Sequence, residues 1–185
     1  MKIKDIIKTS SALLGKENVL GYLTDQTTFN DKFTLYEVNL FTTLLNNLLG
    51  ELAGTYIPMV KTEKVNGTTE VYFKNLTENA IRILDVLDFN ERPVAYSLTA
   101  EKIKANSTFY YVVYEYVPTN YNLEDVIGYT AKDVSKTALA YGLCAEFCIS
   151  QARYSEALIF HDKYVSEIEK KQKRKNAKTV ARLWR

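Results

Sequence analysis

The sequence has few of the residues from which enzyme sites are commonly built. It contains one histidine, two cysteines and seven glycines among 185 residues. The glycines are scattered, and there is no Gly-rich phosphate loop, no Cys-x-x-Cys pair and no histidine-containing metal spacing. The single histidine, His161, lies beside Asp162 without a sequence-adjacent nucleophile that it could activate. We therefore expect a protein that is not an enzyme and that has no catalytic residue, cofactor or metal.

The two cysteines, Cys144 and Cys148, lie four residues apart in a region of helical pattern. They could form half of a metal site, but zinc normally takes four nitrogen or sulfur ligands and only one histidine exists to complete the set. We favour the interpretation that both are small core residues.

Long apolar runs are also missing. No segment approaches the roughly 18 apolar residues of a membrane span, and the first residues, MKIKD, do not resemble a secretory signal. We expect a cytosolic or particle-bound protein with no membrane partner. Aliphatic and aromatic residues are nevertheless abundant, with a hydrophobic content of 46%, 14 Tyr and 8 Phe, so most of the chain should fold around a core.

Apolar residues at steps of three and four predict helices in the first part of the chain. A first helix runs from Ile3 to Leu14, with Gly15 as its stop, and a short second helix covers residues 17–23. A longer helix follows over residues 33–53 and has a broad apolar face. Gly54 suits the left-handed position that often follows a helix end.

The pattern then changes to alternation, which predicts an antiparallel sheet of four or five strands. Asn66-Gly67 is a strong local signal for a hairpin turn. The segment TFYYVVYEYV (108–117) is apolar on both faces, so this strand should be central or covered by helices. Its aromatics could stack on bases, but its only charge is Glu115, and core packing is the better interpretation. The expected strands cover residues 56–65, 70–74, 80–87, 93–98 and 108–117.

Helical spacing returns after residue 130. A helix through Leu143 and Phe147, a short turn at Arg153-Tyr154 and a last helix capped by Ser155 form an antiparallel hairpin over residues 131–169. The apolar positions of the last helix are Leu158, Tyr164, Val165 and Ile168.

These elements predict an α+β fold: a helical bundle with an inserted antiparallel β-sheet and a basic C-terminal arm. The N-terminal helices (1–54) and the C-terminal hairpin form the bundle, and the sheet occupies residues 55–118. We expect residues 1–169 to be a single domain and residues 170–185 to be the arm.

The arm, KKQKRKNAKTVARLWR, contains eight basic residues and no acid. The remaining 16 Lys and Arg face 22 Asp and Glu, so residues 1–169 carry about −6 and the arm +8. Such an arm could bind the phosphates of a nucleic acid, dock on an acidic protein surface, or only aid solubility. The arm ends in the apolar residues Leu183 and Trp184, which a segment that only aids solubility does not need. We favour protein docking, followed by folding on the partner.

Three segments stand out as a set: VNLFTTLLNNLLGELAGTYIPM (38–59), FYYVVYEYVP (109–118) and SKTALAYGLCAEFCISQARYSEALIFHDKYVSEI (135–168), followed by the basic segment that ends ARLWR. In these segments the chain resembles the head-to-tail connector (adaptor) proteins of tailed bacteriophages. Members of this family often end in Arg-Arg-Trp, whereas Leu183 separates Arg182 from Trp184 here.

The resemblance implies a structural virion protein at the neck, assembled in the host bacterial cytoplasm. It would form a ring, usually a dodecamer, beneath the portal, with DNA passing through its centre and with tail or stopper (head-completion) proteins below. The arm would dock on the portal. The alternative is a DNA-binding or packaging accessory protein that uses the same arm. The expected docking residues are Lys171, Lys173, Arg174, Lys175, Lys178, Arg182, Leu183, Trp184 and Arg185.

Overall fold

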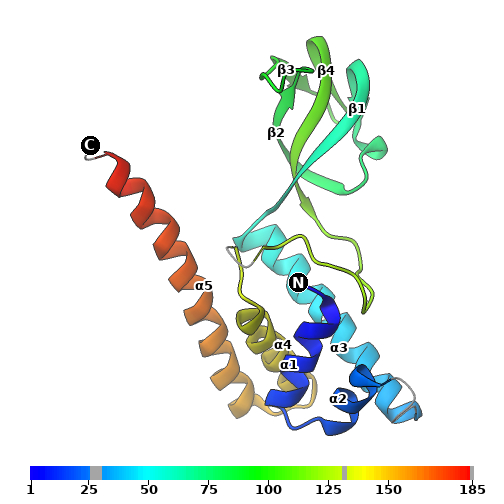
Figure 1. Ribbon diagram of the computed structural model, residues 1–185, viewed down its shortest axis with the longest axis vertical. Helices are drawn as coiled ribbons and strands as arrows, with labels where there is room; N and C mark the ends of the chain where they lie inside the picture. The colour runs from blue at the N-terminus through cyan, green and yellow to red at the C-terminus, as the bar shows by residue number, and fades with distance from the viewer. Residues whose placement is uncertain (26–30, 131–132, 184–185) are drawn as a thin grey trace. The chain divides into compact units, whose positions relative to one another are not determined.

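The computed structural model describes residues 1–25, 31–130 and 133–183, with side chains as far as Lys170 (Figure 1). It confirms a mixed α+β architecture, with five α-helices and one antiparallel sheet among these residues. The chain separates into two compact units rather than one: a helical unit (1–48 and 121–185) and a sheet unit (49–120). The sheet is therefore an insertion that forms its own core.

The described part of the helical unit contains five helices, which Figure 1 labels along the chain. The spacing of Ile3, Ile6 and Ile7 places all three on the buried side of the first helix. Gly15 adopts φ +67° after that helix and confirms the expected stop. The helices are α1 (Ile3–Leu13), α2 (Glu17–Thr24), α3 (Lys32–Glu51), α4 (Lys136–Ser150) and α5 (Tyr154–Leu183).

Helix α4 lies at the centre of this unit. Ser135 caps its start by accepting a hydrogen bond from the Ala138 amide at 3.0 Å. Phe147 stacks on Phe41 of α3, with ring centroids 4.4 Å apart and planes within 5°. Small residues along α4 allow its neighbours to approach closely. A Cβ added at Gly142 would lie 2.8 Å from Leu48 Cδ2, so this position has no room for a side chain.

A buried ion pair joins the α1–α2 turn to α3. Lys16 Nζ lies 2.5 Å from Glu37 Oε1, and Asn18 Nδ2 donates to Glu37 Oε2 at 2.9 Å. Glu37 is only 4% exposed. The Lys16 ammonium also lies 5.2 Å from the ring centroid of Phe147. The carboxylate thus replaces its lost hydration with two donors, and the lysine contacts the face of an aromatic ring.

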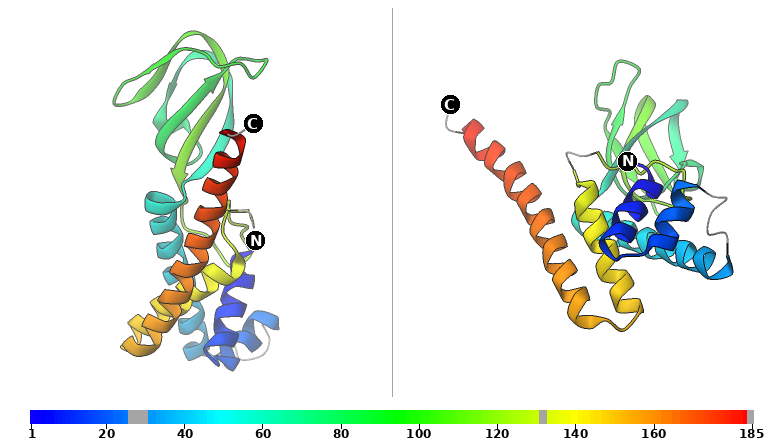
Figure 2. Two further views of the ribbon diagram at one scale, coloured as in Figure 1. Left: turned by 90° about the vertical axis from the view of Figure 1, so that its left-hand side faces the viewer. Right: turned by 60° about the horizontal axis from the view of Figure 1, so that its bottom comes forward.

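The sheet unit is organised around one long strand, as Figures 1 and 2 show. Strand β4 (Lys102–Val117) pairs with β1 (Met59–Tyr72) along one edge. Along its other edge it pairs with β2 (Asn79–Leu87) and, nearer its start, with β3 (Tyr96–Leu98). The prediction that the aromatic strand is central is confirmed. Every pairing is antiparallel, and Phe109, Val112 and Tyr114 are fully buried in the unit's core.

The predicted hairpin at Asn66-Gly67 is wrong, because residues 59–72 form one continuous strand. Both halves of β1 pair with β4 rather than with each other, and the register shifts between Lys64 and Thr68. Gly67, at φ +39°, lies in this irregularity against the ring of Tyr110. Pairing with a core strand therefore overrides the local turn signal, and the glycine is used in a bulge.

Three further boundaries differ from the predictions. Helix α3 ends at Glu51 and continues as a π-helical turn (Leu52–Tyr56), in which Leu52 is buried and Gly54 does not adopt the left-handed conformation. The strand expected at 93–98 shortens to β3, preceded by a single bridge between Pro93 and Leu87. Helix α5 continues beyond residue 169 to Leu183.

Candidate functional site

The predicted docking residues lie mostly outside what the structure describes. Two of them, Trp184 and Arg185, lie outside the described residues altogether. For the other seven the structure does not describe the side chains: Lys171, Lys173, Arg174, Lys175, Lys178, Arg182 and Leu183. What is described is the helix that carries this segment. Helix α5 spans 30 residues, twice the 15 of α4, and Figures 1 and 2 show it continuing well past α4. The candidate site is therefore the surface of α5.

The start of α5 is set by a tight turn after α4. Ala152 adopts φ +56°, and the Arg153 amide donates to the Cys148 carbonyl at 2.8 Å. Arg153 then pairs with Glu156 one turn later. Because the helix begins at Tyr154, the prediction that Ser155 is its N-cap is wrong. The left-handed residue and the ion pair define this end instead.

One side of α5 packs on α4. Ala157 and Ile168 are buried, and Tyr164 is half-buried. A Cβ added at Gly142 of α4 would lie 3.1 Å from Tyr164 Cδ2, so the absence of a side chain there lets the tyrosine ring approach the α4 backbone. Helices α4 and α5 therefore pack on one another through this side.

A second side of α5 carries large apolar residues in contact with solvent. Tyr154, Leu158 and Val165 recur at i, i+4 and i+11 and are 68%, 62% and 37% exposed. We call these three residues the α5 stripe. Leu158 and Val165 were expected among the packed positions of the hairpin, and for these two residues that expectation is wrong. The packing of α5 on α4 buries the neighbouring side of the helix and leaves the stripe open.

Charge along α5 is divided into two blocks. Between Tyr154 and Glu169 four acidic residues face one lysine, which gives a formal charge of −3. From Lys170 onward there are eight basic residues and no acid. The boundary is marked by an ion pair between Lys170 Nζ and Glu167 Oε1 at 2.8 Å. The α5 stripe lies in the acidic half.

The histidine and the cysteines do not form a reactive cluster. His161 Nδ1 lies 4.0 Å from the Asp162 carboxylate on the exposed side of α5. Cys144 and Cys148 are both fully buried, which confirms them as core residues. Burial raises the pKa of Cys144 to about 12, so its thiol stays protonated at neutral pH. The described part of the chain contains no group of three or more His, Cys, Asp or Glu that could hold a metal ion.

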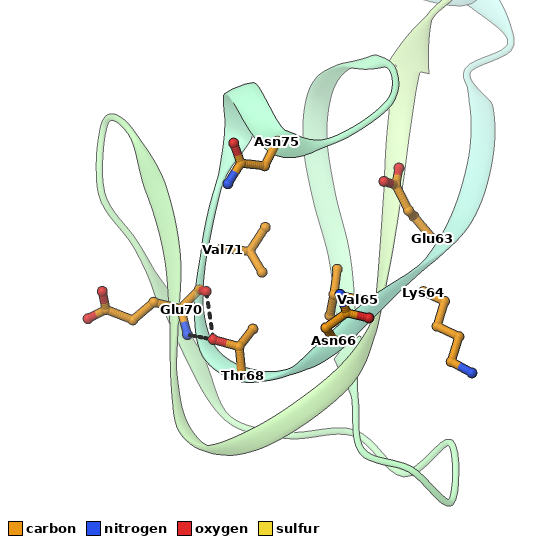
Figure 3. A pocket seen from close by; sticks show the side chains of 8 residues that line it. All are labelled: Glu63, Lys64, Val65, Asn66, Thr68, Glu70, Val71 and Asn75. Atoms are coloured by element: carbon orange, nitrogen blue, oxygen red, sulfur yellow. Dashed lines mark hydrogen bonds between the residues drawn. The ribbon is translucent and has the colours of Figure 1, made fainter.

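The sheet unit has a shallow hollow of about 350 Å³ inside the curl of β1 (Figure 3). The carboxylates of its two acidic lining residues, Glu63 and Glu70, already accept hydrogen bonds from other side chains of the sheet unit. Tyr114 Oη donates to Glu63 at 2.6 Å, and Lys102 Nζ donates to Glu70 at 2.6 Å. Figure 3 shows the Glu70 side chain pointing away from the hollow, while the Thr68 hydroxyl bonds to the Glu70 backbone. We interpret the hollow as a consequence of the β1 bulge. Its lining residues are Glu63, Lys64, Val65, Asn66, Thr68, Glu70, Val71 and Asn75.

Helix α5 therefore combines an exposed apolar stripe with two blocks of opposite charge. Among the helices of the described residues, none combines the length and the apolar character needed to span a membrane. No protein-family model matches the chain, and no curated protein matches its sequence with significant similarity.

Proposed function

We propose that this protein is a structural virion subunit, a head-to-tail connector (adaptor) that forms a ring beneath the portal and joins the capsid to the tail. The observation that carries the proposal is the extension of α5. Its 30 residues continue far beyond the hairpin partner and end in a block of charge +7, which Arg185 extends to +8. A helix that projects a charged, aromatic-tipped end from a folded body is suited to docking in a larger assembly.

The family resemblance supports the same proposal, because its segments coincide with framework elements of both units. Residues 38–59 cover most of α3, the π-helical turn and the start of β1. Residues 109–118 cover the second half of β4 and the proline after it, and residues 135–168 cover α4, its N-cap and the part of α5 that packs on α4. In this proposal the helices form the body of the ring, and the segment from Lys171 to Arg185 reaches the portal. Tail or stopper proteins bind below, and DNA passes through the centre.

Truncation of the arm tests the docking role. Deleting residues 170–185 should abolish binding to the portal protein in a pull-down or co-sedimentation assay, while the circular dichroism of the rest of the fold is retained. A matched variant, Leu183→Ser with Trp184→Ser, keeps all eight basic residues and isolates the apolar contribution; it should weaken binding as well. Undiminished portal binding by the truncated protein would refute the docking role.

The basic block also favours the second candidate, a DNA-binding or packaging accessory protein. A helix with eight cations should then shift duplex DNA at about 50 mM salt, with log K falling by roughly 0.9 per log unit of salt for each phosphate contacted. Electrophoretic mobility shift across a salt series measures this slope. A salt-dependent shift together with absent portal binding would favour the accessory role. Negative-stain images of a ring with a central channel, formed alone or with portal, would favour the connector.

A further inference from the structure

We propose that in the isolated protein two copies pair through antiparallel α5 helices, so that residues 170–185 of each copy cover the α5 stripe of the other. This inference goes beyond the connector proposal and does not depend on it, because it concerns what occupies the stripe before any other partner is present.

The first argument is the apolar surface itself. Tyr154, Leu158 and Val165 lie on one side of α5 and are all more than a third exposed. The eleven residues from Tyr154 to Val165 correspond to about 16 Å of helix. The strip is interrupted at His161 and Asp162, which are 59% and 74% exposed. Three large apolar side chains on the open side of a helix that is packed along its other side are nevertheless suited to a contact with a second helix.

The second argument is charge complementarity, which selects the occupant and its direction. An acidic side chain flanks the stripe: Asp162 lies about 40–80° from its residues around the helix and is 74% exposed. The segment from Tyr154 to Glu169 as a whole carries a formal charge of −3. All charged residues of the segment from residue 170 are basic, and the segment also contains Val180 and Leu183. A parallel pair would set the two basic blocks side by side, whereas an antiparallel pair sets each basic block against an acidic one.

The third argument is the geometry of a two-fold pair. A helix of 30 residues is about 45 Å long. If two copies cross at their midpoints, residue 158 of one lies opposite residue 179 of its partner, and both stripes are covered at once. Such an isologous contact closes at two copies. Three apolar side chains are fewer than a standard interface of about 800 Å² per partner contains, so the pair should depend on its charges and weaken with salt.

Sedimentation velocity of the full chain tests the pairing. We expect dimers at about 50 mM salt and monomers at about 500 mM. Leu158→Ser with Val165→Ser should raise the dissociation constant at least tenfold. The matched control, Val60→Ser with Ile81→Ser, changes two residues of the sheet unit that are 56% and 53% exposed and should leave the dimer intact. A monomer at 50 mM salt, a larger ring, or a dimer unaffected by the α5 substitutions would overturn the proposal.

Cross-linking tests the direction. With a mild oxidant such as copper–phenanthroline, Leu158→Cys combined with Thr179→Cys should give a disulfide-linked dimer, because the two positions of one helix are about 31 Å apart and cannot react with each other. The buried native Cys144 and Cys148 serve as the unreactive background. Efficient disulfide linkage by the Leu158→Cys variant alone would indicate a parallel pair and overturn the proposed antiparallel pairing. Portal binding by the Leu158→Ser/Val165→Ser variant reports separately on the connector role.

Discussion

The buried pair of Lys16 and Glu37 allows a quantitative prediction. Replacing Lys16 with Met keeps an apolar stem of similar length but removes the ammonium 2.5 Å from the Glu37 carboxylate. Breaking a buried pair usually costs about 3–5 kcal/mol, because the remaining charge is left without compensation. Here the Lys16 side chain is 27% exposed and Asn18 still donates to Glu37, so we expect a loss of about 2–3 kcal/mol.

Thermal and urea unfolding followed by circular dichroism at 222 nm measure this loss. For a chain of this size it corresponds to a fall in melting temperature of roughly 4–12 °C. The sequence has a single tryptophan, Trp184, in the terminal segment, so the helical signal is the better probe of this core. The control is Lys2→Met, because Lys2 and its partner Glu124 have side chains 51% and 58% exposed. This change should cost less than about 1 kcal/mol.

A double-mutant cycle with Glu37→Gln separates the pair from its surroundings. The amide leaves no unpaired charge, so Lys16→Met should cost about 1–2 kcal/mol less in the Glu37→Gln variant than in the native chain. The reasoning is refuted if the two substitutions are additive, or if Lys16→Met costs no more than Lys2→Met.

Two further predictions concern the sheet unit. Gly67→Ala should lower the free energy of unfolding by about 1–2 kcal/mol in urea titrations, since the backbone is at φ +39° and the new Cβ would lie 2.8 Å from Tyr110 Cε1. The control is Gly54→Ala, where a new Cβ would have nothing within 4 Å and the change should be neutral or stabilising. Equal effects of the two substitutions would contradict this account of β1. Burial, followed by the hydrogen bond to Glu63, raises the pKa of Tyr114 from 10.0 to about 12. The folded state therefore holds this proton more tightly, so the associated stability is present below pH 10 and is lost as pH rises towards 12. Tyr114→Phe should show a smaller loss over that range in melting temperatures measured against pH, and an unchanged alkaline slope would contradict the assignment.

Much of the helical unit could be predicted from local spacing. Ile3, Ile6 and Ile7 define the buried side of α1 because residues three and four apart share a helix face, and Gly15 ends the run because it tolerates the left-handed conformation. The central position of β4 was also predictable, since a strand with apolar residues on both faces needs cover on both.

The candidate site could be predicted only in part. The basic block is visible in the sequence, but Leu158 and Val165 seemed equivalent to Tyr164 and Ile168 because all four are apolar and helically spaced. Helix α4 distinguishes them, because it packs against only one side of α5. The Tyr164 ring lies against the α4 backbone at Gly142, whereas Leu158 and Val165 lie on the exposed side. Which apolar residues of α5 are exposed depends on where α4 packs, and the apolar spacing within α5 alone does not predict this.

The sequence by itself determined where the helices and the central strand lie and how charge divides between residues 1–169 and the last sixteen residues. These properties depend on residues close together in the chain. The tertiary structure alone decided that β1 pairs with β4 across the Asn66-Gly67 signal and that the α5 stripe stays open. Strand pairing and burial depend on contacts between distant segments, whose free energy can exceed the local preference of any turn or helix face.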